Sequence, residues 1–548
     1  MPIALALWCL QDAASADLVV YGRLFTADEA RPRAEALAVR GERIVRVGDR
    51  AEVEPLVGPE TRVIDAGDSS VVPGFNDAHC HFTVGYGIPP DLDLSGASSL
   101  EELQELLRRH VEAHPDDDVI HGHGWDLADL PGERYPTRRM LDEVVGDRAA
   151  VLWSEGPHGV WCSTEALERA GLDSDWEPSP TTIALRDPET GELSGTILGR
   201  GLLFLFPFLR RPDLGELRMG IAHGQRDALS FGVTSVQESV SPLIVPYLAH
   251  LYDEGELLLR LHVWGSLFRG GANGAEAQLK AAEKYARGDW LTFGALKGGV
   301  DGMPGLRTAA LLAPYADDPA TRGLLTLDEE ELGRGIADAN ERGVAVTLHA
   351  AGDGGVRLCL DAVASVEPEA RLRNRIEHAF AVEPGDWARF AELGVVASVQ
   401  PGFLCTELAK GGYYARRFGE ERSAHVLPLA SLLDAGCTLA FGTDFSLTPI
   451  DPMVGLYGAV ARRPLPSAGD APAFVPDEAI DLGQALRAYT FGSAFAQGAE
   501  GAKGRLREGL LADLVVLSRD VFEAPLGELP EVRVLTTVVG GRVAYEAE

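Results

Sequence analysis

VVPGFNDAHCHF, residues 71–82, runs from an apolar segment through Pro73 and Gly74 to two histidines separated by one residue. The apolar segment is typical of a buried strand that ends at the histidines. Side chains two positions apart in a strand point to the same face, so His79 and His81 can converge on one metal ion. Taken alone, the motif fits two hydrogen-bonded histidines equally well.

Seven further strand-like runs follow along the chain, and most are separated by amphipathic helical stretches such as residues 327–343. Strands that alternate with helices are typical of a parallel sheet. Eight such units predict an α/β fold, a closed (β/α)8 or TIM barrel. The predicted strands are residues 71–79, 232–239, 257–266, 291–299, 344–353, 375–379, 395–400 and 438–444.

The sequence pattern at the two ends of the chain differs from the alternating strand and helix pattern of the middle. Residues 17–73 and 500–548 contain short Val/Ile-rich runs broken by Gly and Asp, which are typical of hairpins. We therefore predict a small β-sandwich domain formed by both termini, with the barrel at residues 74–499. The interval after the first barrel strand is too long for one helix, which predicts an insertion subdomain at about residues 85–230.

Composition narrows the function classes. The 548 residues include 49 Lys and Arg against 83 Asp and Glu, a formal net charge of −34, with 46% hydrophobic residues. Such a hydrophobic fraction excludes a disordered or fibrous chain. Nucleic acids and anionic membranes need clustered Lys and Arg, so the acidic balance argues against both as partners. We expect a small-molecule substrate, and a homodimer is left open.

The N-terminal segment and the distribution of cysteines indicate the compartment in which the protein is expected. Residues 1–16 combine a short apolar run with a small-residue end, but they lack a basic segment and carry Asp12. The expected localisation is cytoplasmic, with export as the alternative if residues 1–16 are a leader remnant. No run approaches the ~18 apolar residues of a membrane span. Six scattered cysteines without a CxxC motif predict reduced thiols.

Potential metal ligands also end later strands of the predicted barrel. Active sites of this fold are built at the carboxyl ends of the strands, so we expect these side chains to meet the two histidines of the first strand. Imidazole and carboxylate ligands suit Zn²⁺, and also Mn²⁺ or Fe²⁺. The lysine is either structural, with one ion bound, or carboxylated by CO₂ and bridging two ions. The residues are Lys297, His349, His378 and Asp444.

Other histidines are weaker candidates. His121 and His123 repeat the one-residue spacing but fall in the insertion, so we interpret them as structural or as part of a substrate pocket. His158 and Trp161 fit a pocket lining and ordinary packing equally well. No catalytic serine elbow, cysteine frame or Gly-rich phosphate loop stands in the required context.

These motifs together resemble the amidohydrolase superfamily, and most closely its amidohydrolase 3 (YtcJ-like) branch, which includes N-substituted formamide deformylases. The matching stretches run in order through nearly the whole chain. They are VVPGFNDAHCHF, GHGWD, GPHGVWCSTEAL, GVTSVQE, LKGGVDGMPGLRTAALLAPYAD, LHAAGDGGVRLCLDAV, RIEHA, FGTDFSLTPIDPMVGLYGAVARR and GRLREGLLADLVVL.

The resemblance implies a set of roles for individual residues. It implies a binuclear centre, with two Zn²⁺ expected, in which His79 and His81 bind the first ion and carboxylated Lys297 bridges. His349 and His378 would bind the second ion, and Asp444 would bind metal and handle a proton. The implied substrate-binding residues are Trp125, Asp126, His158, Trp161, Asp301 and Arg307.

Three positions depart from the branch and put the substrate in doubt. Cys162 stands where Asn is frequent, Phe380 where Gln is common, and Phe445 where a smaller residue is usual.

The predicted function is that of a metal-dependent hydrolase that cleaves an amide-type C–N bond, in an N-substituted formamide or a related amide. The ion would bring the pKa of water to about 7. Asp444 would accept the proton and return it to the leaving nitrogen. Two alternatives stay open: a metal enzyme of another reaction type, such as an isomerase, lyase or lactonase, and a catalytically silent metal-binding homologue.

Overall fold

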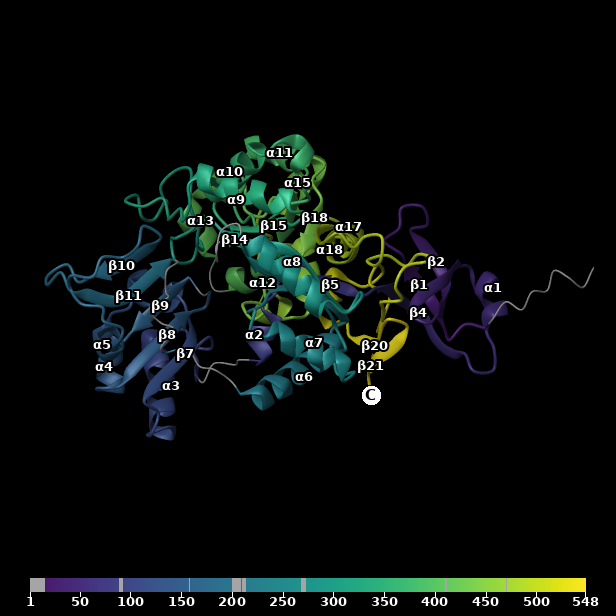
Figure 1. The fold of residues 1–548 in the computed structure, drawn as a ribbon, viewed down its shortest axis with the longest axis horizontal. Helices are drawn as coiled ribbons and strands as arrows, with labels where there is room; N and C mark the ends of the chain where they lie inside the picture. The colour runs from purple at the N-terminus through teal and green to yellow at the C-terminus, as the bar shows by residue number, and fades with distance from the viewer. Residues whose placement is uncertain are drawn as a thin grey trace, which may run out of the picture.

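A computed structural model describes most of the chain. The described residues form three sheets, with the insertion on one side of a central barrel and the terminal sheet on the other (Figure 1). Most of the predicted leader remnant, residues 1–14, lies outside the described part. The described residues are 15–87, 92–156, 158–199, 208, 213–267, 273–409, 412–469 and 471–548.

The central sheet is a nearly closed, all-parallel barrel of eight strands, which confirms the predicted fold class. Its first and last strands approach each other where Ala78 N donates to Phe441 O at 3.0 Å. In sheet order the strands are β5 (Phe75–Asp77), β12 (Val233–Ser239), β13 (Arg260–Ser266), β14 (Leu291–Gly299), β15 (Ala345–Ala350), β16 (Arg375–His378), β17 (Val396–Val399) and β18 (Leu439–Phe441).

The first barrel strand is shorter than its sequence suggests. It ends at Asp77, so His79 and His81 lie just beyond it and strand alternation does not set their directions. Hydrogen bonds to neighbouring strand ends hold the segment instead: Cys80 N donates to Gln237 O at 3.2 Å, and His81 N to the carbonyl of Phe445. These contacts fix the two histidines at the carboxyl end of the barrel.

Amphipathic helices cover the barrel. The helix predicted at residues 327–343 is α9 (Glu329–Glu341), which begins after Asp328, whose side chain accepts from Glu331 N at 2.8 Å. Leu332 and Ile336 are four positions apart and buried against the barrel. Further covering helices are α6 (Leu214–Ser230), α7 (Val245–Asp253), α8 (Asn273–Tyr285), α10 (Asp353–Ala364), α11 (Trp387–Glu392), α15 (Leu429–Asp434), α16 (Pro452–Ala461), α17 (Leu482–Arg487) and α18 (Ser493–Gln497).

The insertion forms a sheet of its own with a separate apolar core. It ends with β11, and α6, which fell within the predicted insertion, packs against the barrel strand β12 instead. In order the strands are β10 (Thr182–Arg186), β11 (Leu193–Gly199), β9 (Gly159–Cys162), β8 (Ala149–Ser154), β7 (Val119–Trp125) and β6 (Leu92–Asp93). Its helices are α3 (Leu100–Ala113), α4 (Arg138–Val145) and α5 (Thr164–Arg169).

Both termini contribute to a single mixed sheet of seven strands. Ile44 N donates to Leu510 O at 2.9 Å, which brings the edge of the sheet back to the C-terminal segment around a shared apolar core. The buried pair Arg260 and Asp513, with Nε 2.8 Å from Oδ2, ties this sheet to the barrel. In order the strands are β21 (Arg542–Glu546), β20 (Val534–Val539), β19 (Leu514–Leu517), β4 (Arg62–Pro73), β1 (Leu18–Phe25), β2 (Arg33–Arg40) and β3 (Arg43–Gly48).

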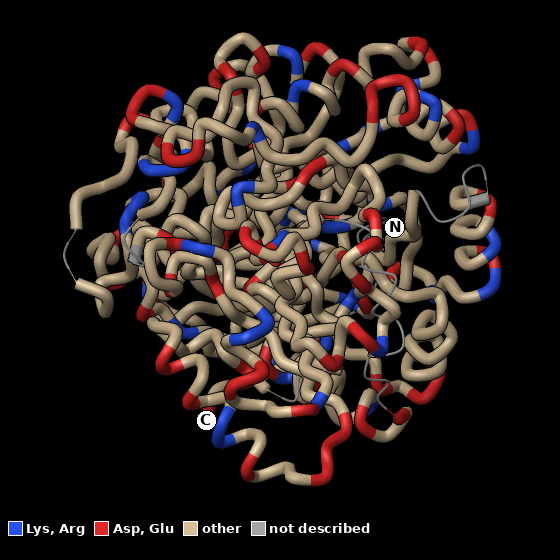
Figure 2. Tube along the Cα trace, turned by 90° about the vertical axis from the view of Figure 1, so that its left-hand side faces the viewer, with Lys and Arg blue, Asp and Glu red and all other residues tan. Residues whose placement is uncertain are grey.

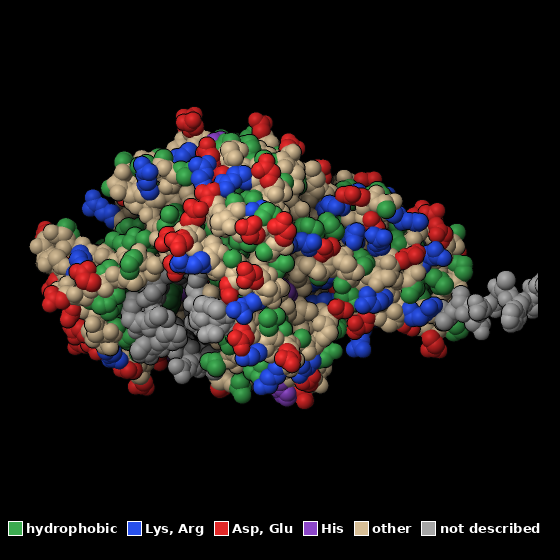
Figure 3. Space-filling model, turned by 45° about the horizontal axis from the view of Figure 1, so that its top comes forward, with side chains coloured by type: hydrophobic (Ala, Val, Ile, Leu, Met, Phe, Trp, Pro, Cys, Tyr) green, Lys and Arg blue, Asp and Glu red, His purple; other side chains and the backbone are tan. Residues whose placement is uncertain are grey.

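Charged residues of both signs are interspersed over the molecule. Figure 2 shows Asp and Glu along many loops and helices, with Lys and Arg among them. The face in Figure 3 shows the same mixture over the barrel and the terminal sheet. In the described part of the chain, no helix has the length and apolar character needed to cross a membrane. The five described cysteines are buried and free.

Candidate metal centre

Three buried side chains converge at the carboxyl end of the barrel. His79, His378 and Asp444 each offer a ligand atom, and these atoms lie within 4.8 Å of one another. His79 Nε2 is 3.5 Å from Asp444 Oδ1, and His378 Nδ1 is 3.7 Å from Asp444 Oδ2. His81 joins them with its Nε2 3.2 Å from Asp444 Oδ1. The structure thus brings together four of the six predicted ligands around one carboxylate.

The carboxylate of Asp444 fits a cation. Its Oδ1 is buried and forms no hydrogen bond with any described residue, although two imidazole nitrogens face it. A buried carboxylate oxygen is costly in free energy unless it is hydrogen-bonded or shares its site with a positive charge. Histidine nitrogens and a carboxylate oxygen are the donors that Zn²⁺ and similar divalent ions bind. The donor set therefore suits a divalent metal ion.

Burial keeps the imidazoles of His79 and His378 neutral. It lowers the pKa of His378 to about 3 and lowers the pKa of His79 as well. Neutral imidazole is the form that ligates metals. Burial alone would raise the pKa of Asp444, but His79 and His81 favour its charged form and hold the pKa below its usual value. The cluster thus presents the carboxylate of Asp444 together with the neutral nitrogens of His79 and His378.

Glu377 fixes the orientation of His79. Its Oε2 lies 2.6 Å from His79 Nδ1, while its Oε1 contacts Arg375 Nε at 2.5 Å and accepts a hydrogen bond from Thr347. An imidazole whose Nδ1 is held by a carboxylate presents its Nε2 to a metal. Lys297 Nζ also lies near this nitrogen, 3.4 Å from His79 Nδ1. The buried glutamate therefore sets which nitrogen faces Asp444.

Further polar groups hold the other two imidazoles. Gln400, just after β17, has Oε1 2.9 Å from His378 Nδ1. His349 Nε2 is 3.1 Å from Gly302 O and 3.6 Å from Asp301 Oδ1. Asp301 accepts backbone hydrogen bonds from Ala310 N, Ala351 N and Gly352 N at 2.9 to 3.0 Å. Asp301 thus anchors the loops beside His349.

A cavity of about 210 Å³ contains the cluster and the remaining predicted ligands. His158 reaches it from the insertion, with its ring centroid 4.7 Å from that of His349. Phe380 stacks parallel to His378 at 6.2 Å. The lining residues are His79, His81, His158, Gly199, Lys297, Met303, His349, Ala351, His378, Phe380, Asp444 and Leu447.

The other predicted substrate residues lie in three places. Trp125 and Asp126 line a second pocket that shares Met303 and Leu447 with the metal-centre cavity. Trp161 is buried in the core of the insertion, where its Nε1 donates to Thr137 O at 2.9 Å. Arg307 pairs with Asp317 at 3.0 Å and with Glu133 at 3.5 Å. Neither Trp161 nor Arg307 lines the metal-centre cavity.

An unusual backbone conformation orients two of the predicted ligands, His378 and Asp444. Both His378 and Asp444 have positive φ, 74° and 57°, which is uncommon for residues other than glycine. Gly442 permits the close approach of β18 to the first strand, because a Cβ there would lie 2.5 Å from His79 N. The chain therefore turns sharply at the ends of β16 and β18, where the ligands stand.

Sequence reasoning missed three polar residues of the site. They are Glu377, Gln400 and Glu238, and all stand at or next to the carboxyl ends of barrel strands. Glu238 accepts a hydrogen bond from Thr83 N at 2.9 Å, and burial raises its pKa to about 7. Their place at strand ends was the signal that could have found them.

Comparison with known proteins identifies the family. The sequence model described as the amidohydrolase family matches residues 62–545. The chain belongs to the amidohydrolase family. This amidohydrolase is 28% identical to the putative amidohydrolase YtcJ of Bacillus subtilis, with 96% of this chain and 98% of that one covered. It is also 28% identical to the N-substituted formamide deformylase of Arthrobacter pascens, with the same coverage. The YtcJ-like branch expected from the sequence is confirmed.

A solved structure has the same architecture. The amidohydrolase superposes on an uncharacterized metal-dependent hydrolase from Pyrococcus furiosus with a TM-score of 0.68 and 28% identity. The match covers 92% of this chain and 99% of the other. The similarity thus extends over nearly the full length of the two relatives and of the solved structure.

Proposed function

We propose that this amidohydrolase is a metal-dependent hydrolase of amide-type C–N bonds, with N-substituted formamides as its substrate class. The observation that carries the proposal is the buried Asp444, whose Oδ1 has no hydrogen-bond partner among the described residues and faces the imidazoles of His79 and His81. The names of the Arthrobacter and Pyrococcus relatives support the reaction class and the metal dependence.

His79, His81, His378 and Asp444 would hold the ion. When bound, a divalent ion lowers the pKa of water towards about 7 and polarises a carbonyl. Asp444 Oδ1 takes the proton of the attacking water, whose oxygen adds to the amide carbon. The same oxygen then returns the proton to the nitrogen as the C–N bond breaks, which gives a carboxylic acid, formate in this class, and an amine.

The proposal extends to a second metal ion, which Lys297 and His349 would help to hold. Lys297 and His349 line the same cavity, and Lys297 Nζ is 3.4 Å from His79 Nδ1. Carboxylation of neutral Lys297 by CO₂ would form a carbamate and release a proton, and would supply an anionic bridge. An uncarboxylated lysine would instead remain a cation near Glu377. Native intact mass distinguishes the two forms by the increment of one CO₂.

The test combines metal content with product identity. Purified protein is analysed for bound metals and incubated with N-alkylformamides, amides and lactams. We expect stoichiometric formate and amine, loss of activity with a chelator, and recovery with Zn²⁺ or Mn²⁺. Bound metal without hydrolysis of any member of this panel would overturn the reaction class, and a product with the mass of its substrate would indicate an isomerase.

A further inference from the structure

Another group of potential metal ligands lies in the insertion. HVEAHPDDD, residues 110–118, covers the last turn of α3 and the loop that follows it. In this segment one ligand atom from each of His110, His114 and Asp117 lies within 4.8 Å of the others. Figure 1 shows α3 at the lower edge of the insertion, outside the barrel. None of the three residues lines the metal-centre cavity, so the group is separate from the ligands at the barrel rim.

The helix brings the two histidines together. His110 and His114 are four positions apart, and side chains with this spacing lie one turn apart on the same face of a helix. Their ring centroids are 4.3 Å apart, with an angle of 30° between the ring planes. Two histidines with this spacing on one helix face form an arrangement that binds Zn²⁺ in proteins. The end of α3 therefore supplies two nitrogen donors for such an ion.

A turn that contains proline supplies a carboxylate. The helix ends at Ala113, and Pro115 follows the capping residue His114, because proline cannot continue the helix. Asp117 N donates to His114 O at 3.4 Å, which closes a four-residue turn. The turn places Asp117 Oδ2 3.8 Å from His110 Nε2. The loop therefore returns an oxygen donor to the histidines.

The distances are close to those of a bound ion. With metal–ligand distances of about 2.0–2.1 Å, two donors of a tetrahedral Zn²⁺ site are about 3.3 Å apart. The side chain of His110 is only 6% exposed, whereas that of Asp117 is 43% exposed. A fixed imidazole thus faces a carboxylate that is able to rotate. A small movement of Asp117 is enough to reach coordination distance.

The hydrogen bonding of His114 presents its second nitrogen to an ion. Its Nδ1 lies 3.0 Å from His110 O. A histidine whose Nδ1 donates to a backbone carbonyl directs its Nε2 to a metal. The carboxyl end of a helix also carries a partial negative charge, which favours a cation. The guanidinium of Arg148 is directed at the backbone carbonyls of His114 at 3.3 Å and Val145 at 3.4 Å.

We propose that His110, His114 and Asp117 bind a divalent transition-metal ion of the Zn²⁺ or Ni²⁺ type at the surface of the insertion. Two imidazoles and one carboxylate suit these ions, whereas Mg²⁺ and Ca²⁺ prefer oxygen ligands alone. Water completes the coordination. The inference does not rest on the proposed function, because these residues belong to the insertion and not to the barrel site.

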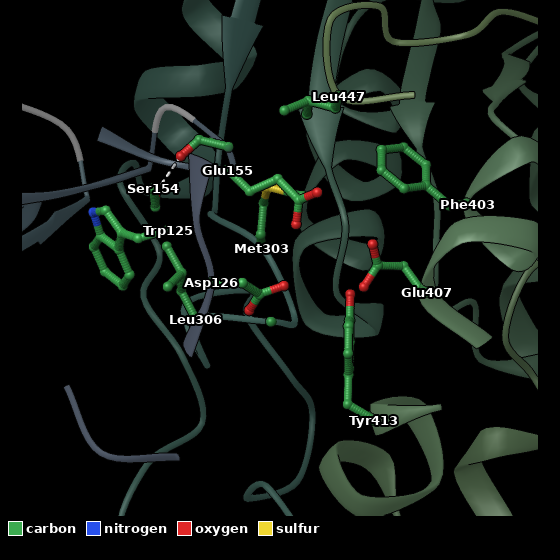
Figure 4. Close-up of a pocket in the computed structure, with 12 residues that line it drawn as sticks. Trp125, Asp126, Ser154, Glu155, Met303, Leu306, Phe403, Glu407, Tyr413 and Leu447 are labelled. Atoms are coloured by element: carbon green, nitrogen blue, oxygen red, sulfur yellow. Dashed lines mark hydrogen bonds between the residues drawn. The ribbon is translucent and has the colours of Figure 1, made fainter. Parts of the chain in front are cut away.

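The ion would fix the segment that leads into β7. This strand begins at Val119, directly after the loop, and ends at Trp125. Trp125 lines the pocket beside the metal-centre cavity (Figure 4). A ligand that binds only the folded form of a segment stabilises that form. Zn²⁺ should therefore slow hydrogen exchange of the amides of residues 110–118, measured by mass spectrometry, and unchanged exchange would contradict the structural role.

The main test measures whether Zn²⁺ protects His114 from chemical modification. Full-length protein is treated with diethyl pyrocarbonate, which modifies accessible imidazole nitrogens, and each modified histidine is mapped by peptide mass spectrometry. We expect Zn²⁺ to slow the modification of His114 about 10-fold at ten times its half-saturating concentration, as for simple saturation of one site. Mg²⁺ should have no effect. Because the signal comes from His114 itself, it does not depend on whether the metal centre binds an ion.

His250 is the matched control in the same sample. It is exposed and lies in the last turn of α7, with Asp253 close by in sequence. Positions 246 and 254 hold proline and glutamate, so this helix end has the carboxylates but lacks the second histidine. Its modification should not depend on Zn²⁺. Equal rates at His114 with and without Zn²⁺, or the same protection at His250, would overturn the site.

Asp117→Asn tests the third ligand. The substitution keeps the size of the side chain and removes its charge, and circular dichroism checks the fold. The Zn²⁺ concentration that half-protects His114 should rise at least about 10-fold, the loss found when even a hydrogen-bond partner of a ligating histidine is removed. Asp116→Asn makes the same charge change one position away and should alter this concentration by no more than about twofold. An equal rise in both variants would show attraction by loop charge alone and overturn the coordination site.

Discussion

Two segments of this chain carry the same His-x-His pattern, and the structure gives them different surroundings. His79 and His81 follow β5 and face the buried carboxylate of Asp444. His121 and His123 lie in β7 of the insertion sheet. The carboxylate near His123 is that of Asp93, with Nδ1 3.6 Å from Oδ1, and its side chain is 63% exposed.

The difference shows that spacing alone does not make a metal site. In the all-parallel barrel the carboxyl ends of β5, β16 and β18 meet at one rim, so ligands distant in sequence converge. In the insertion, β7 runs parallel to both β6 and β8, and the carboxylate near His123 is that of Asp93 on β6, which is exposed to solvent. A carboxylate that closes the ligand set therefore occurs at the first pair of histidines and is exposed at the second.

The largest expected effect is on turnover, and it distinguishes Asp444 at the barrel site from Asp93 beside His123 in the insertion. Asp444→Asn should reduce turnover of an N-substituted formamide by roughly 10²- to 10⁴-fold, because the amide cannot accept the proton of water. The fold, measured by circular dichroism, should remain. Asp93→Asn, the matched change in the insertion, should leave turnover within about twofold, as is usual for a surface substitution. Near-normal turnover of Asp444→Asn would remove its proton role.

A second contrast replaces the histidines themselves. The double variant His79→Ala with His81→Ala should lose bound divalent metal, because two nitrogen donors leave the site. The double variant His121→Ala with His123→Ala should retain the wild-type metal content. Elemental analysis after dialysis against a weak chelator measures both. Equal loss from the two variants would place metal at the insertion and contradict the barrel site.

Sequence patterns found most of the barrel because strands and helices alternate clearly, and β14 has the bounds that the sequence predicts, residues 291–299. They missed Glu377 because neighbours in a strand should face opposite sides. The positive φ of His378 breaks that alternation at the strand end, so adjacent side chains both reach the site. Closure of the barrel decides which side chains distant in sequence touch, and the spacing of strands along the sequence does not predict these contacts.

A third prediction concerns Glu377, a buried carboxylate that holds His79 by a hydrogen bond, whereas the carboxylate near His123 is exposed. Glu377→Gln keeps the shape but removes the charge beside His79 Nδ1. We expect metal affinity to fall about 10- to 100-fold, as for other partners of ligating histidines. Loss of the buried pair with Arg375 should also lower the melting temperature. Metal affinity is measured by competition with a chelator, and an unchanged value would show that His79 needs no carboxylate to orient it.

The smallest expected effect is a dependence of stability on pH in the metal-free protein. His378 is buried and its pKa is lowered to about 3, whereas an unfolded histidine has a pKa of about 6.5. Between these values the unfolded chain binds a proton that the folded chain does not. Stability should therefore fall as pH decreases through 6.5, by about 2 kcal/mol at pH 5 from this residue alone.

His378→Phe removes that contribution and keeps a ring beside Phe380. Denaturant unfolding at pH 7 and pH 5 should show a smaller loss of stability in the variant than in the wild type, by about the same 2 kcal/mol. The variant starts from a lower stability because Gln400 loses its partner, so the comparison uses the change with pH and not the absolute value. Parallel pH curves would show that the folded protein already protonates His378 at pH 5.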